Sequence, residues 1–165
     1  MTSRRKGRIL AFQALYCWEV NRLPIEDLTG FSWVENDKLA KLDPGIISFS
    51  RLLIAGTIEN IKVIDHTIRR YLQNWDFSRL KRVDLAILRM SVYTLMFQRE
   101  ISPSIVINEA IGLSRQFGTD NSYRFINGVL DTIRIALQTA PQEEKAGETA
   151  GEPLPVQAAP CSSQN

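Results

Sequence analysis

The chain is poor in the side chains that most often carry catalysis or bind metals. Its 165 residues include one histidine, His66, and two cysteines, Cys17 and Cys161. Cysteines so far apart form neither a disulfide framework nor a metal-ligand spacing, which is typical of a reducing compartment. A structural zinc site needs about four ligands, and these three residues do not supply them. We therefore expect no metal, no cofactor and no enzyme activity.

The sequence also has no hydrophobic run long enough to cross a membrane. Its most apolar stretch, residues 83–97, contains Asp84 and Arg89 and is shorter than the roughly 20 residues that a span needs. No uninterrupted apolar segment follows the arginine-rich start, so we expect no signal peptide. These absences predict a cytoplasmic protein with no membrane partner.

Alternating runs of β-branched residues are missing too, so the sequence predicts no strands. Apolar residues instead recur every three or four positions, and Asp43-Pro44 is a typical start of a helix. We expect Gly118 to end the helix that precedes it, in the left-handed conformation. The pattern predicts an all-α bundle of about seven helices.

Composition divides the chain in two. Residues 139–165 are rich in Ala, Pro, Glu, Gly, Ser and Gln, which bury too little apolar surface to fold, so we expect a disordered tail. Residues 1–138 are expected to form one helical domain. The tail holds one Lys and four Glu, a charge of −3, and because the whole chain carries +2, the domain carries +5. A mildly basic domain suggests a polyanionic partner.

Four cations stand almost together near the N-terminus: Arg4, Arg5, Lys6 and Arg8. In a helix, Arg5 and Arg8 share one side with Phe12 and Tyr16. Cations that hold phosphates, beside rings that stack on bases, suit a single-stranded nucleic acid. The alternative is that both rings belong to the core and the arginines are merely exposed.

A second candidate lies in Ser122-Tyr-Arg-Phe-Ile-Asn-Gly-Val-Leu-Asp131. Gly128 costs this helix about 1 kcal/mol relative to alanine, so we expect it to pack tightly against a neighbouring helix. Phe125 lies about 100° around the helix from the core residue Ile126, beside Arg124. Such a pair is placed to stack on an RNA base and hold a phosphate. The alternative is a boundary phenylalanine that is half buried for packing alone.

Three blocks resemble the NusB family of bacterial transcription antitermination proteins, in the family's order and over about residues 4–135. The blocks are Ala11-Phe-Gln-Ala-Leu-Tyr16 after the arginine-rich start, Val83-Asp-Leu-Ala-Ile-Leu-Arg89, and Ile107-Asn-Glu-Ala-Ile111 followed by Phe117-Gly118 and residues 122–131. The resemblance implies two three-helix subdomains. It also implies binding to boxA RNA in nascent rRNA transcripts, jointly with the ribosomal protein NusE. Other Nus factors and RNA polymerase would belong to the same antitermination complex.

Carried over by position, the resemblance implies a set of RNA contacts: Arg4, Arg5, Lys6, Arg8, Arg124 and Phe125. It implies NusE contacts at Tyr16 and Asp84. The sequence departs from the family pattern at Thr94 and Gly112, where glutamate is usual, and neither position belongs to the RNA set.

Two other functions are compatible with the residues. One is an RNA-binding domain related to the N-terminal part of rRNA cytosine methyltransferases, which would require an α/β domain with a glycine-rich nucleotide loop and a catalytic cysteine. The other is a structural homodimer built through exposed apolar helix faces.

Overall fold

The computed structural model of the protein describes residues 3–139, and every regular element in that range is helical. The elements are α1 (Ser3–Asn21), α2 (Ile25–Gly30), α3 (Asn36–Leu39), α4 (Pro44–Glu59), α5 (Ile61–Tyr71), the 3-10 turn η1 (Phe77–Arg79), α6 (Arg82–Phe97), α7 (Pro103–Phe117) and α8 (Ser122–Thr139). The predicted all-α fold is confirmed. In the described part, two short helices, α2 and α3, lie between α1 and α4. The predicted tail lies outside the described residues, except for Thr139.

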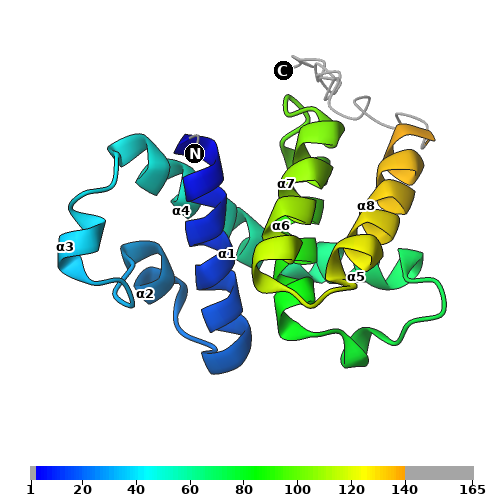
Figure 1. The fold of residues 1–165 in the computed structure, drawn as a ribbon, viewed down its shortest axis with the longest axis horizontal. Coiled ribbons are helices and arrows are strands. Elements are labelled where there is room, and N and C mark those ends of the chain that lie inside the picture. The colour runs from blue at the N-terminus through cyan, green and yellow to red at the C-terminus, as the bar shows by residue number, and fades with distance from the viewer. Residues whose placement is uncertain (1–2, 140–165) are drawn as a thin grey trace, which may run out of the picture.

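Two groups of helices meet along the middle of the molecule, α1–α4 on one side and α5–α8 on the other (Figure 1). Helix α1 packs on α4 in the first group, α7 packs on α8 in the second, and α1 packs on α6 across the boundary. Buried residues of both groups form one continuous core, from Leu10 and Phe12 to Leu130 and Ile133. This arrangement agrees with the bundle of two subdomains that the family resemblance implied.

Helix α6, which contains the most apolar stretch of the sequence, is the central helix. Twelve of its sixteen residues are buried, from Asp84 to Leu95. A helix with apolar residues on most faces is stable only when other helices cover it, and α1, α4, α5, α7 and α8 all contact it. The family departure Thr94 lies inside this helix, where its hydroxyl donates to the carbonyl of Met90 at 3.0 Å.

One buried cation on α6, Arg89, joins three helices. Its Nε and Nη2 donate to the two carboxylate oxygens of Asp65 on α5, each at 2.8 Å, and its Nη1 donates to Glu19 on α1 at 2.5 Å. Burial lowers the pKa of Arg89, but the hydrogen bonds to Asp65 and Glu19 outweigh burial and raise it above its ordinary value. The network therefore stabilises the contact between the two groups of helices.

The helix starts follow the capping rules in part. Asp43 caps α4 as predicted, and its Oδ1 accepts from the backbone N–H of Gly45 at 2.7 Å. Asp76 also caps, with its carboxylate accepting from the N–H of Ser78 at 2.9 Å, but the element that it starts is the short turn η1. Helix α6 begins only at Arg82. Residues 72–81 therefore form a connection that runs over the surface beside α8.

Two glycine predictions are wrong. Gly118 has φ −89° and ψ −171°, which is extended rather than left-handed backbone. A β-carbon there would lie 2.5 Å from the carbonyl oxygen of Ser114 and 2.7 Å from Cβ of Ser122, so close packing requires the glycine. At Gly128 no neighbouring atom lies within 4 Å of the β-carbon position, so the tight helix contact expected there does not exist.

The tight helix contact is made at Gly56 instead. A β-carbon on this residue of α4 would overlap the ring of Tyr93 on α6. The Tyr93 ring is itself stacked on Phe97, with the ring centroids 5.4 Å apart. Glycine thus allows the α4 backbone to lie directly on an aromatic face.

No helix between residues 3 and 139 has the length and apolarity to cross a bilayer. The same range contains no cluster of three or more His, Cys, Asp or Glu side chains arranged to hold a metal ion.

Candidate nucleic-acid interface

The basic first turns of α1 are partly docked on the protein itself. Arg4 and Lys6 are exposed, and the Arg4 guanidinium lies 4.4 Å from the centre of the Phe49 ring on α4. Arg8 is buried, with 7% of its surface exposed, and lies 5.4 Å from the same ring. Burial lowers the pKa of Arg8, and the nearby Arg4 charge adds to this effect while Glu109 opposes it. Phe49 thus fixes the direction of two of the four predicted RNA-contacting cations.

Arg5 lies between α1 and α7. Its Nη1 is 3.5 Å from a carboxylate oxygen of Glu109. The same nitrogen lies 2.6 Å from the position that a β-carbon of Gly112 would occupy. The departure from the family pattern at Gly112 therefore has a local structural consequence, because the missing side chain leaves room for the Arg5 guanidinium.

The two aromatic residues predicted to share one side of α1 with Arg5 and Arg8 lie in different environments. Phe12 is a core residue with 3% of its surface exposed, and its ring packs on Phe117 of α7 at 4.9 Å. Tyr16, one turn later, is 38% exposed and lies at the surface. The packing alternative therefore holds for Phe12, whereas Tyr16 remains available to a partner.

The start of α8 presents the second predicted pair. Arg124 is exposed, and its Nε donates to the hydroxyl of Tyr123 at 2.9 Å. Phe125 is half-buried, and its ring lies 5.2 Å from that of Trp75. Trp75 is 62% exposed, more than any other large hydrophobic residue in the described part of the chain. Phe125 therefore belongs to an aromatic pair at the surface.

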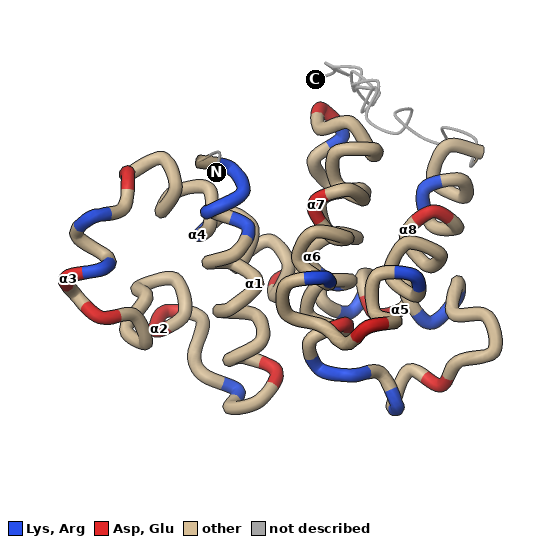
Figure 2. Tube along the Cα trace, viewed as in Figure 1, with Lys and Arg blue, Asp and Glu red and all other residues tan. Residues whose placement is uncertain are grey.

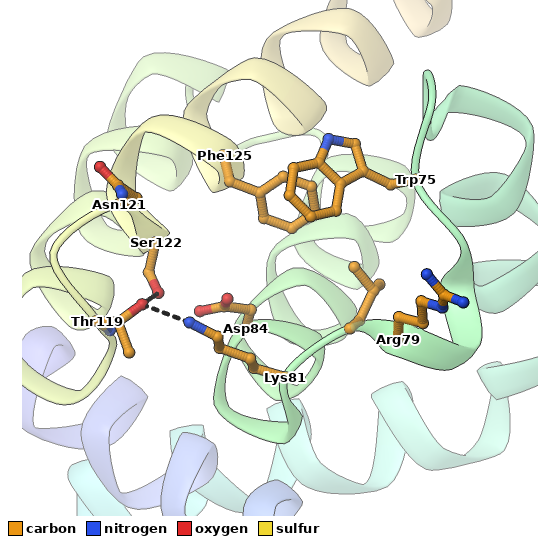
Figure 3. A pocket seen from close by; sticks show the side chains of 9 residues that line it. Trp75, Arg79, Lys81, Asp84, Thr119, Asn121, Ser122 and Phe125 are labelled. Atoms are coloured by element: carbon orange, nitrogen blue, oxygen red, sulfur yellow. Dashed lines mark hydrogen bonds between the residues drawn. The ribbon is translucent and has the colours of Figure 1, made fainter.

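A small pocket opens beneath this aromatic pair (Figure 3). Its volume is about 100 Å³, and it is lined by Trp75, Arg79, Leu80, Lys81, Asp84, Thr119, Asn121, Ser122 and Phe125. The Nζ of Lys81 donates to the hydroxyl of Thr119 at 2.8 Å across its mouth. The volume is well below the roughly 300–1,000 Å³ of typical small-molecule sites, so the pocket suits the end of one side chain.

Asp84 contributes the unusual group of this pocket. It lies in the first turn of α6, where the helix dipole favours a carboxylate, and only 6% of it is exposed. Its Oδ1 has no hydrogen-bond partner among the described residues. Buried polar atoms in proteins are almost always hydrogen-bonded, so this oxygen is suited to accept a donor from another molecule.

These groups lie along one seam between α1 and α7. The Arg5–Glu109 pair lies near its start, the Phe12–Phe117 contact lies roughly 10 Å further along α1, and Thr119 follows at the pocket. Lys and Arg residues gather at the start of α1, in the segment leading into α6 and around the start of α8 (Figure 2). The predicted RNA residues therefore lie at two places, the start of α1 and the start of α8, and Asp84 lines the same pocket as Phe125.

Several residues of this surface were missed by sequence reasoning. They are Trp75, Lys81, Thr119 and Ser122. Trp75 follows the apolar pattern of α5 and suggests only the end of a helix. Its exposure depends on the turn at Asn74, which adopts φ 61°, and no local pattern shows that this turn brings the ring to α8. Lys81 is 38 residues away from Thr119 in sequence, so no local pattern indicates that it meets the hydroxyls of Thr119 and Ser122.

The comparisons with known proteins agree on one family. The family model described as "NusB family" matches residues 5–134. The transcription antitermination protein NusB of Treponema denticola is 51% identical over 131 residues, which cover 79% of this chain and 95% of that protein.

Two solved structures have the same fold. One is T. maritima NusB, with TM-score 0.71 and 36% identity, covering 82% of this chain and 92% of that one. The other belongs to a crystal structure of antitermination factors NusB and NusE in complex with dsRNA, with TM-score 0.73 and 27% identity, covering 82% of this chain and 98% of the matched chain.

Proposed function

Because the chain belongs to the NusB family of transcription antitermination proteins, we propose that it binds boxA RNA of nascent rRNA transcripts together with NusE. The family membership confirms the predicted class of function, transcription antitermination. The observation that supports the binding mode is the seam, which has exposed cations at one end and exposed aromatics with an unsatisfied carboxylate at the other. The methyltransferase-related domain and the structural homodimer are not favoured.

The RNA contacts divide into two kinds. Arg4 and Lys6 at the start of α1 bind phosphates directly. Arg5 and Arg8, which are less exposed, add positive electrostatic potential beside them. At the other end of the seam, Phe125 stacks on a base while Arg124 holds the adjoining phosphate. Phosphate contacts position the strand, and the stacked base gives the α8 end its preference for unpaired RNA.

NusE binds near Tyr16 and Asp84 in this proposal. Tyr16 offers an exposed ring with a hydroxyl, and Asp84 Oδ1 accepts a hydrogen bond from a donor that NusE supplies. The small pocket above Asp84 admits one side chain, which fits a protein partner better than a nucleotide. Other Nus factors and RNA polymerase join the same complex.

The remaining parts of the proposal concern the whole chain. The protein acts by binding, without catalysis, in the cytoplasm. Residues 1–138 form the binding domain, and residues 139–165, which lie outside the described part except for Thr139, contribute no RNA contact because their net charge of −3 repels phosphates. The direct test is a titration of boxA RNA and a scrambled control, each with and without NusE. Equal affinity for both RNAs in the presence of NusE would contradict the proposal.

The basic cluster can be tested through salt dependence. Arg4→Gln with Lys6→Gln should weaken binding to all RNAs and flatten the log–log salt slope by about 1.4, because each phosphate contact to a single strand contributes about 0.7. The measurement is the affinity for a single-stranded boxA oligonucleotide between low and moderate salt.

A matched control removes the same charge elsewhere. Lys38→Gln with Lys41→Gln changes two exposed lysines at and just after α3, away from the seam, and should leave the slope close to wild type. If both double variants reduce the slope equally, the effect is one of net charge and the cluster holds no phosphates.

Phe125 can be tested by separating affinity from stability. Phe125→Ala should cost about 1–3 kcal/mol of boxA binding, the usual contribution of a ring stacked on a base. Because Phe125 is half-buried, its loss of stability should stay below the roughly 3–5 kcal/mol of a fully buried phenylalanine. Phe97→Ala is the control, since Phe97 is 46% exposed but lies at the end of α6. A Phe125→Ala protein that melts far earlier yet binds normally would place the ring in the core.

A further inference from the structure

Gly128 has no structural reason to be glycine. It lies in the middle of α8, where glycine costs about 1 kcal/mol relative to alanine. No neighbouring atom lies within 4 Å of its β-carbon position, so packing does not exclude a side chain. Its helical conformation does not call for glycine either, because no glycine in the described part of the chain has positive φ. The space above Gly128 is open to solvent, so another molecule could approach the helix backbone closely there.

That space is part of a groove of about 290 Å³ between α8 and the segment that follows α5. Tyr71, Gln73 and Trp75 line one side, and Arg124, Gly128 and Thr132 line the other. Positions 124, 128 and 132 follow one another on a single face of α8 because each is four residues from the next. Gly128 therefore forms a bare stretch of helix backbone between a guanidinium and a hydroxyl.

Trp75 dominates the opposite side of the groove. The residue is 62% exposed, although burial of a tryptophan would stabilise the fold. The preceding residue, Asn74, adopts the left-handed conformation with φ 61°, and the Trp75 ring lies 5.2 Å from the ring of Phe125 on α8. Trp75 therefore contacts Phe125 in a tilted arrangement and keeps most of its surface open to solvent.

We propose that this groove holds one nucleotide of a single-stranded RNA, with its base stacked on Trp75 and its ribose against the bare backbone of Gly128. Arg124 holds the phosphate of that nucleotide. The inference rests on the proposed RNA-binding function and extends it, because it adds a second stacking residue and gives Gly128 a role. Trp75 and Phe125 line both this groove and the small pocket, so the groove continues the proposed interface.

The chemistry of the groove favours RNA over a protein segment. An exposed ring, a guanidinium and an amide from Gln73 are the groups that bind unpaired nucleotides, through stacking, charge and hydrogen bonds. No carboxylate lines the groove, so nothing there repels a phosphate. Exposed Arg124, one turn from the uncovered backbone at Gly128, can pair with the single negative charge that each RNA nucleotide carries.

The first experiment makes Gly128→Ala and Gly128→Gln and measures thermal stability and boxA affinity. Alanine should raise the melting temperature by about 3–5 °C, because the helix gains propensity and no atom is displaced. Glutamine should also leave the fold stable but lower boxA affinity at least about fivefold, the effect of overpacking a tight contact. Gly128→Ala should lower boxA affinity less than Gly128→Gln does. In Gly128→Ala the melting temperature would thus rise while boxA affinity falls.

Gly30→Ala is the matched control. Gly30 is the last residue of α2, and it too has no atom within 4 Å of its β-carbon position. It lies in the other group of helices, so its replacement should leave RNA affinity unchanged. Wild-type affinity in Gly128→Gln would overturn the proposal.

The second experiment reads the stacking directly. RNA should quench the fluorescence of Trp75, and Trp75→Phe should remove most of that quenching while keeping much of the affinity. Trp75→Ala should lower boxA affinity about 5- to 100-fold. Quenching that persists in Trp75→Phe would overturn the proposal.

The outcomes separate this inference from the proposed function. If wild-type protein with NusE does not prefer boxA RNA over the scrambled control, the proposed function fails. If wild type prefers boxA but the Gly128 and Trp75 variants bind it equally well, only the nucleotide groove is wrong. If those variants bind RNA normally and lose NusE instead, the groove holds the protein partner and the proposal is overturned.

Discussion

Replacing Arg89 by methionine is expected to lower the free energy of unfolding by about 3–5 kcal/mol, the usual cost of removing one partner from a buried ion pair. Methionine fills similar space, so the loss arises from the two acids that remain. Asp65 and Glu19 keep side-chain exposures of only 14% and 15%, and each would lose its hydrogen bonds from Arg89. Urea unfolding measures the effect, and a lower midpoint at unchanged slope would show a change in stability alone.

Arg134→Met provides the comparison for Arg89. Arg134 pairs with Asp131 one turn earlier on α8, at side-chain exposures of 29% and 48%. Water screens such a pair, so its loss should cost less than about 1 kcal/mol. Similar losses in the two variants would mean that the Arg89 network contributes no more than an ordinary surface ion pair.

Gly56→Ala is expected to destabilise the protein by about 1–3 kcal/mol, although alanine favours a helix. The added methyl would overlap the Tyr93 ring, and the stacking of Tyr93 on Phe97 leaves that ring little room to move. The same substitution should therefore have opposite signs at Gly56 and Gly128, two glycines inside helices. Thermal or urea unfolding of the two variants checks this contrast.

A double variant identifies the cause at Gly56. Combining Gly56→Ala with Tyr93→Leu removes the ring that the methyl meets, so the combined loss should be smaller than the sum of the two single losses. Additive losses would show that the destabilisation does not come from the contact with Tyr93.

The elements that depend on local sequence were predictable. Asp43-Pro44 starts a helix because the carboxylate and the proline ring satisfy the first turn without help from elsewhere. The most apolar stretch, residues 83–97, lies in α6, and most of that helix is buried because its apolar residues cover most faces. The sequence pattern predicted a helix over residues 122–131, and the structure has Arg124 and Phe125 in its first turn.

The features that depend on distant neighbours were not predictable. The sequence does not show that the β-carbon position of Gly118 lies against Ser114 and Ser122 while that of Gly128 has no atom within 4 Å. Whether each glycine has close neighbours depends on the packing of α7 on α8 and on the path of residues 72–81. For the same reason Trp75 went unrecognised, because its exposure is a property of the turn at Asn74 and of α8 together.

The way in which α1 presents its arginines bears on the thermodynamics of association. A flexible arginine loses up to about 1.5–2 kcal/mol of rotamer entropy when it is immobilised. Arg4 and Arg8 already rest on Phe49, and Arg5 already lies against Glu109 and Gly112. Much of this immobilisation therefore accompanies folding, and an incoming strand has less disorder to remove. The first turns of α1 are therefore preorganised for binding, because the positions of their arginine side chains are set in the folded protein before a polyanion binds.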